Sequence, residues 1–206
     1  QKFEFESVID RAEIDQFKIL FSTLRKMNFE KHVRNQCKEI LNSFFKYYSS
    51  DQHFLNWALA CYEHFCSVSL DVQNRIHESD IYLYRKSLYS AGFSVLVCLC
   101  NDFYHYKMIS DLYNLTFLVD VGLCGKDFSY NVAEACNQES RIPGSGRFYL
   151  HQQNVSEVEQ DLFYDHPELS YKMIKDLKLL YYPELAECVL YQHELADGTG
   201  FPREVT

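Results

Sequence analysis

Three ionisable residues stand where the helical pattern of the sequence predicts buried positions. Asp120 follows an apolar run at the end of a predicted helix, His166 directly precedes a proline, and His193 continues an apolar helical face. A buried carboxylate needs a cation or several hydrogen-bond donors, and carboxylate and imidazole groups both bind transition-metal ions. A metal ion, an Arg or a Lys would each satisfy Asp120. His193 would serve equally as a hydrogen-bonded core residue, and His166 as the cap of a turn, so these alternatives stay open at each position.

The elements that must position these residues are predicted to be helices. Apolar residues recur at three- and four-residue steps through most of the chain. Because proline is favoured at the first position of a helix, we expect a new helix to start at Pro167. Residues 125–152 lose the periodicity, and no strand-like alternation is long enough to predict a sheet. The stretches with helical periodicity are 14–24, 33–45, 54–65, 79–99, 109–119, 155 onward and 183–195.

The most distinctive segment is the loop His193-Glu-Leu-Ala-Asp-Gly-Thr-Gly-Phe-Pro202, whose glycines and proline impose a particular backbone path. It closely resembles the HHExxDGxGYP signature of HD-GYP proteins, with Gln192 in place of the first His and Phe201 in place of Tyr. Two upstream segments occur in the family's order. His166-Pro-Glu-Leu-Ser170 resembles its HPxxG motif, and Leu118-Val-Asp-Val-Gly122 resembles its Leu-His-Asp-Ile-Gly motif.

HD-GYP proteins are helical phosphodiesterases that hydrolyse cyclic di-GMP with paired metal ions, often iron. The resemblance covers roughly residues 80–206. It implies an HD-domain-like helical bundle over 78–206, and the periodicity predicts a smaller N-terminal helical region over 1–77, which the resemblance does not reach, so we expect an all-α fold. The N-terminal region would serve in sensing, dimerisation or docking, with a soft boundary near 70–78. By position, the resemblance also implies that Asp120, His166 and His193 correspond to metal ligands of the family.

The sequence departs from the family pattern at residues that bind metal or phosphate and not at the residues that set the backbone path of the loop. Val119 stands in place of the His of the HD pair, and Gln192 in place of the first His of the HH pair. Leu123 and Leu195 stand where the family has a Lys and an Arg. Val cannot bind a metal, and Gln is a poor replacement for imidazole. The three retained residues form a two-His, one-carboxylate set, which would either hold a single ion or hydrogen-bond internally with none.

We therefore expect a catalytically impaired HD-GYP-like signalling protein that acts by binding a protein or a cyclic dinucleotide. The resemblance implies a diguanylate cyclase-type or other signalling protein as partner and cyclic di-GMP as a ligand. No cofactor is expected beyond at most one Fe or Mn ion. The alternatives are a residual metal-dependent phosphodiesterase for cyclic di-GMP or a related phosphoester, and a helical adaptor with no nucleotide link. The expected binding loop comprises Glu194, Asp197, Gly198, Gly200, Phe201 and Pro202.

Charge, apolar runs and cysteine content indicate which ligands and which cellular compartment to expect. The net charge of −9 and the scattered basic residues argue against binding nucleic acid, which needs clustered Lys and Arg. The longest apolar run, Phe93 to Cys100, is far shorter than the roughly 20 residues that cross a bilayer, and no signal peptide opens the chain. The eight cysteines include no CxxC pair, so we expect mostly buried, reduced thiols and a cytoplasmic protein that binds no membrane. The aromatic-rich N-terminal helices leave a homodimer open.

Overall fold

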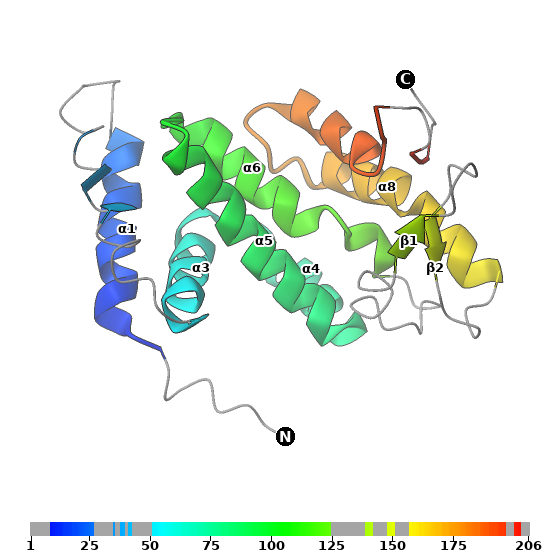
Figure 1. Ribbon diagram of the computed structural model, residues 1–206, viewed down its shortest axis with the longest axis horizontal. Helices are drawn as coiled ribbons and strands as arrows, with labels where there is room; N and C mark the ends of the chain where they lie inside the picture. Colours follow the sequence, from blue (N-terminus) through cyan, green and yellow to red (C-terminus); the bar gives the residue numbers. More distant parts are fainter. Residues whose placement is uncertain are drawn as a thin grey trace. The chain divides into compact units, whose positions relative to one another are not determined.

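The computed structural model describes residues 9–26, 35, 38, 39, 41, 42, 51–124, 139–141, 148–150, 157–196 and 200–202. These residues are almost all helical, which confirms the expected all-α fold (Figure 1). The α-helices are α1 Arg11–Lys26, α3 Asp51–Phe65, α4 Leu70–Ser79, α5 Ile81–Cys100, α6 Tyr106–Leu118 and α8 Glu157–Leu177. Two 3-10 helices, η2 Val121–Leu123 and η3 Pro183–Tyr191, complete the helical elements of the described residues.

A small antiparallel hairpin was not predicted from the sequence. Strands β1 Glu139–Arg141 and β2 Phe148–Leu150 pair with Glu139 opposite Leu150. Each strand has only three residues, too few for a period-of-two pattern to be recognised. The rest of the segment 125–152, and most of the predicted helix 33–45, lie outside the described residues.

Contacts divide the chain into two compact units. Unit 1 comprises Gln1–Ser67 and Leu88–Thr116, and unit 2 comprises Val68–Ser87 and Phe117–Thr206. Both α5 and α6 therefore contribute residues to each unit. The stretch 70–78, where the sequence suggested a soft boundary, lies within α4. The division into regions 1–77 and 78–206 stays a prediction.

The core of unit 1 is built around the fully buried ring of Trp57. The rings of Phe17 and Phe21 from α1 meet it edge-on, with centroids 5.0 and 5.3 Å away. The indole Nε1 donates to the carbonyl of Gly92 at 2.8 Å, so the polar edge of the ring is also satisfied. The predicted apolar face of α1 is confirmed, because all five of its residues are buried: Ile14, Phe17, Leu20, Phe21 and Leu24.

In unit 2, helix α8 packs against both η2 and η3. Gly122 in η2 lies so close to α8 that an added Cβ would come within 2.5 Å of the His166 carbonyl oxygen. Its amide also donates to the hydroxyl of buried Ser170 at 2.9 Å. This hydrogen bond from Gly122 to Ser170 thus connects η2 to α8. This contact places the residues before η2 beside His166.

The predicted helix start at Pro167 is wrong, because Pro167 lies inside the continuous helix α8. Proline in a helix lacks the N–H that would bind the carbonyl four residues earlier. Here that carbonyl, of Phe163, receives a hydrogen bond from the His166 side chain instead. The helix can therefore continue through the proline. At the other end of unit 2, η3 ends at Tyr191, earlier than the predicted limit of residue 195.

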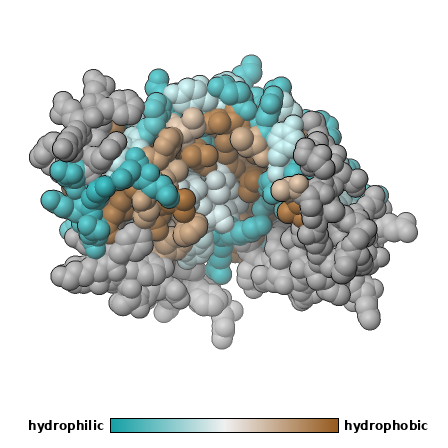
Figure 2. Space-filling model, turned by 45° about the horizontal axis from the view of Figure 1, so that its top comes forward, coloured by the Kyte–Doolittle hydropathy of each residue, from teal (hydrophilic) through white to brown (hydrophobic). Residues whose placement is uncertain are grey.

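The surface shows two further features. Hydrophobic residues reach it in several places (Figure 2), and the large ones that are more than half exposed are Ile19, Leu70, Phe93 and Tyr181. Within the described residues, no helix is long and apolar enough to cross a membrane. No described cysteine forms a disulfide, and the expectation of buried thiols is wrong for two of them. Cys61 is buried, whereas Cys100 and Cys188 are exposed at the surface.

Candidate metal centre

The three ionisable residues singled out in the sequence lie together in unit 2. Asp120 precedes η2, His166 lies in α8, and His193 follows η3. Each offers one ligand atom, and these atoms all lie within 4.8 Å of one another. The Nε2 atom of His166 is 3.2 Å from Nε2 of His193 and 3.5 Å from Oδ1 of Asp120. Asp120 and His166 are buried and His193 is half-buried.

The two separations that His166 makes suit the coordination of a single small ion. Ligand atoms about 2.1 Å from a metal are roughly 3.0 Å apart at a right angle and roughly 3.4 Å apart at a tetrahedral angle. The observed 3.2 and 3.5 Å lie close to that range. Two imidazoles and one carboxylate suit a first-row transition metal such as iron or manganese. The donor set therefore fits one ion.

Pro167 helps to orient the imidazole of His166. Because proline has no N–H, the carbonyl of Phe163 would lack a helical partner. A carbonyl can only accept, so the Nδ1 atom of His166 must carry the proton in its hydrogen bond to Phe163. In the neutral ring, Nε2 then presents its lone pair to Asp120 and His193. Metal-binding histidines are commonly held in this way, with the second ring nitrogen donating to a carbonyl.

Asp120 has a lysine beside it, one of the partners that the sequence left open, although the sequence did not identify which lysine. The Nζ atom of Lys86, from α5, lies 2.9 Å from Oδ2 of Asp120, while Oδ1 faces His166. Burial raises the pKa of Asp120, but the charge and hydrogen bond of the Lys86 ammonium oppose it, and that pKa lies below its usual range. The carboxylate is therefore ionised. Nothing in the spacing of Lys86 and Asp120 along the chain linked the two residues.

The two positions at which the sequence departs from the HD-GYP motifs that it resembles, Val119 and Gln192, are joined to each other. The side-chain amide of Gln192 donates to the main-chain carbonyl of Val119 at 3.2 Å. The same nitrogen lies 3.1 Å from Nε2 of His166. An amide has two N–H groups, so Gln192 can donate to both acceptors. The residues at the substituted positions thus satisfy neighbouring polar groups without an ion.

His193 is held by the loop that follows it. The ring of Phe201 stacks on the imidazole with centroids 4.5 Å apart and an 11° interplanar angle, and the Phe201 amide donates to the His193 carbonyl at 3.2 Å. Gly200 permits this approach, because an added Cβ would come within 2.4 Å of the His193 carbonyl oxygen. Burial lowers the pKa of His193 to about 4. His193 is therefore neutral near pH 7, with a lone pair for a ligand.

The loop residues have unequal exposure. Gly200 and Phe201 are buried, and the Phe201 ring also contacts Phe163 and Tyr164. Glu194 and Pro202 are half-buried, while Asp197 and Gly198 lie outside the described residues. The Phe201 ring therefore faces the candidate site and not the solvent. In this conformation it supports His193.

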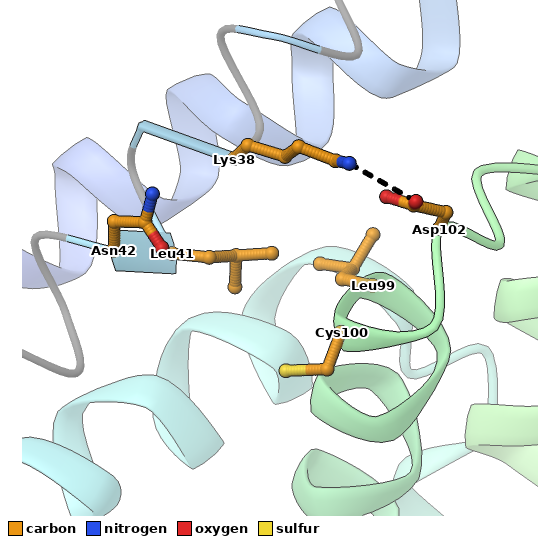
Figure 3. Close-up of a pocket in the computed structure, with 6 residues that line it drawn as sticks. All are labelled: Lys38, Leu41, Asn42, Leu99, Cys100 and Asp102. Carbon is orange, nitrogen blue, oxygen red and sulfur yellow. Dashed lines mark hydrogen bonds and ion pairs between the residues drawn. The ribbon is translucent and has the colours of Figure 1, made fainter.

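Unit 1 contains a separate pocket of about 380 Å³ (Figure 3). Its apolar wall is formed by Leu41 and Leu99, and Cys100 lies beside them. Lys38 and Asp102 point toward each other and form an ion pair at 3.0 Å. Because their charges are paired with each other, the pocket gives no indication of a charged ligand.

Comparison with known proteins bears on unit 2. The family model described as HD domain matches residues 135–206, a span that includes His166 and His193 and begins after Asp120. No curated protein and no solved structure gives a match. The matched segment is therefore similar to HD domains, and the match supports a relationship of this part of the chain to the HD superfamily.

Proposed function

We propose that the protein is a catalytically impaired relative of the HD-GYP phosphodiesterases and acts in signalling by binding. The observation that carries this proposal is the hydrogen bond from Gln192 to the Val119 carbonyl. In the resembled family both positions hold histidines. Here a neutral amide and an aliphatic residue occupy them, and neither is a good ligand for a divalent transition metal. A pair of ions would lack the ligands that hold it.

The charge balance of the site supports the same conclusion. Buried carboxylates need a compensating cation, which metal ions provide in metal-dependent hydrolases. In this chain the Lys86 ammonium already contacts Asp120. The site therefore needs no ion to keep Asp120 charged in the interior. In this chain the contacts that a metal ion would make are replaced by contacts within the protein, from Lys86 to Asp120 and from Gln192 to Val119.

One ion still has a place in this account. It would be held by Asp120, His166 and His193, and when bound it would polarise a phosphate oxygen as a Lewis acid. The residues themselves would orient it, through the Phe163 contact of His166 and the stacking of Phe201 on His193. A single ion would serve to bind a phosphate-bearing ligand.

Partner binding remains an inference from the resemblance. The partner would be a diguanylate cyclase-type or other signalling protein, and the ligand would be cyclic di-GMP. Because Phe201 is buried, the loop would offer a partner its half-buried Glu194 and Pro202 and not the aromatic ring.

A paired titration tests this function. Cyclic di-GMP and a purified diguanylate cyclase domain are each titrated onto the protein by calorimetry, with Mn²⁺ present. The cyclic di-GMP samples are then analysed for linear product. Binding of at least one of the two without product is expected. Absence of binding by both would overturn the signalling role, and product formation would overturn the impairment.

The geometry also favours one second candidate, a one-metal phosphohydrolase. Its basis is the set of three ligand atoms at separations that suit an ion. If this candidate is right, Mn²⁺ or Fe²⁺ will support hydrolysis of cyclic di-GMP or a related phosphoester, and His193→Ala will abolish it. Absence of bound metal after purification with iron or manganese present would exclude it.

A further inference from the structure

We propose that Lys86 is a built-in cation that takes the place of one metal ion beside Asp120. It would limit the candidate site to at most one divalent ion and weaken the binding of that ion. This inference rests on the proposed function, since it concerns the same site. It goes further, because it attributes the reduced metal binding to Lys86, a residue that lies outside the three motifs.

The geometry assigns the two oxygens of Asp120 to different partners. Oδ2 lies 2.9 Å from the Lys86 ammonium, and Oδ1 lies 3.5 Å from Nε2 of His166. The Asp120 side chain is 6% exposed and the Lys86 side chain 41% exposed. The ammonium therefore covers the Oδ2 side of the carboxylate from a direction that solvent can reach. An ion bound to Oδ2 of Asp120 would need the space that the ammonium occupies.

Electrostatic repulsion follows from this placement. An ion on Oδ2 would lie about 2.1 Å from that oxygen, and so within a few ångströms of the Lys86 nitrogen. Like charges at such a distance repel strongly where the surroundings are poorly polarisable. The nearby replacements Val119 and Gln192 add no negative charge to offset this repulsion. Binding of a second ion is therefore disfavoured while Lys86 contacts Asp120.

The same charge acts on the ion that the remaining ligands could hold. Such an ion would contact Oδ1 of Asp120 together with the Nε2 atoms of His166 and His193. Lys86 neutralises the one carboxylate in this set. It therefore reduces the attraction of the site for a divalent cation without removing any ligand. Removing the Lys86 charge should strengthen metal binding, unlike removal of a ligand, which should weaken it.

The experiment measures metal binding without any substrate. Mn²⁺ is titrated by calorimetry onto the wild type, Lys86→Gln and Lys86→Arg, and the number of bound ions is counted by equilibrium dialysis. Lys172→Gln, which removes an exposed positive charge from α8, is the control for net charge. We expect Lys86→Gln to bind Mn²⁺ at least about tenfold more tightly than the wild type. The Arg variant and the control should stay within about threefold of the wild type.

Two results would overturn the inference. One is a wild-type protein that binds two ions per chain, a count that remains decisive even if a Lys86 variant fails to fold. The other is a folded Lys86→Gln variant that binds Mn²⁺ no more tightly than the wild type. Neither result depends on turnover or on a signalling partner. Failure of this inference is therefore distinguishable from failure of the proposed function.

Discussion

The Nδ1 atom of His166 donates to the carbonyl oxygen of Phe163, one helical turn earlier in α8. In an uninterrupted helix the amide four residues after Phe163 would bind this carbonyl. Pro167 occupies that position and has no N–H. The proline thus frees a main-chain acceptor for the side chain of its own neighbour. This gives the His-Pro pair a physical role, since it fixes which nitrogen of His166 faces Asp120 and His193.

Replacing Pro167 with Ala should therefore have opposite effects on the helix and on the site. The new N–H would compete for the Phe163 carbonyl, and α8 should gain roughly 1–3 kcal/mol of stability, since an interior proline costs about 3 kcal/mol. His166 would lose its fixed tautomer. Urea denaturation measures the first effect and ¹⁵N chemical shifts of the imidazole measure the second. A variant whose His166 keeps its proton on Nδ1 alone would contradict this role, with Glu168→Ala as the control in the same helix.

Replacing Phe201 with Ala should destabilise unit 2 by about 3 kcal/mol, the usual cost of removing a buried Phe side chain. The ring is 4% exposed and stacks on His193. The matched control is Phe93→Ala, because Phe93 is 56% exposed and should lose far less. Chemical denaturation compares the two variants. Equal losses of stability would mean that the Phe201 ring is not packed as described.

The helices and their buried faces were largely predictable from the sequence. In α5, five residues of the predicted apolar pattern are all buried: Leu83, Leu88, Ala91, Val95 and Leu99. This succeeds because a helix repeats every 3.6 residues, so local spacing alone shows which positions share a face. The helical pattern singled out Asp120, His166 and His193 one by one, and only the resemblance grouped them, because local periodicity cannot show which residues converge in space.

The partners of these residues were not predictable. Lys86 reaches Asp120 from another helix, and Gln192 reaches the main chain of Val119 from a segment remote in sequence. Such contacts depend on packing between elements, about which local spacing says nothing. Pro167 failed as a helix boundary for a related reason, because the side chain of His166 replaced the hydrogen bond that the proline removes.

Acidification should weaken the fold through His193. Burial lowers the pKa of His193 from 6.5 to about 4 in the folded chain. Between these values the unfolded chain binds more protons than the folded one, so this contribution to stability is lost as the pH falls through that range. Urea denaturation at pH 7 and pH 5 should show a larger loss for the wild type than for His193→Gln. Equal losses in the two proteins would contradict the lowered pKa.

Alkylation should distinguish the cysteines. Burial, and then the charge of Asp120, raise the pKa of Cys124 to about 12, so very little thiolate is present near pH 8. Cys188 is exposed. Iodoacetamide at pH 8 should modify Cys188 in the native protein and leave Cys124 unmodified, as read from peptide masses. Unfolding in urea should make both react. Equal rates in the native state would contradict the raised pKa of Cys124.

The central claim is that the site lacks the ligands needed to hydrolyse cyclic di-GMP as HD-GYP proteins do. It is tested most directly by incubating the purified protein with cyclic di-GMP and Fe²⁺ or Mn²⁺, and measuring linear product beside a His193→Ala control. We predict no product above that control. Product formed by the wild type and lost in His193→Ala would contradict the account, because it would show that Asp120, His166 and His193 suffice for catalysis or that other residues supply the missing ligands.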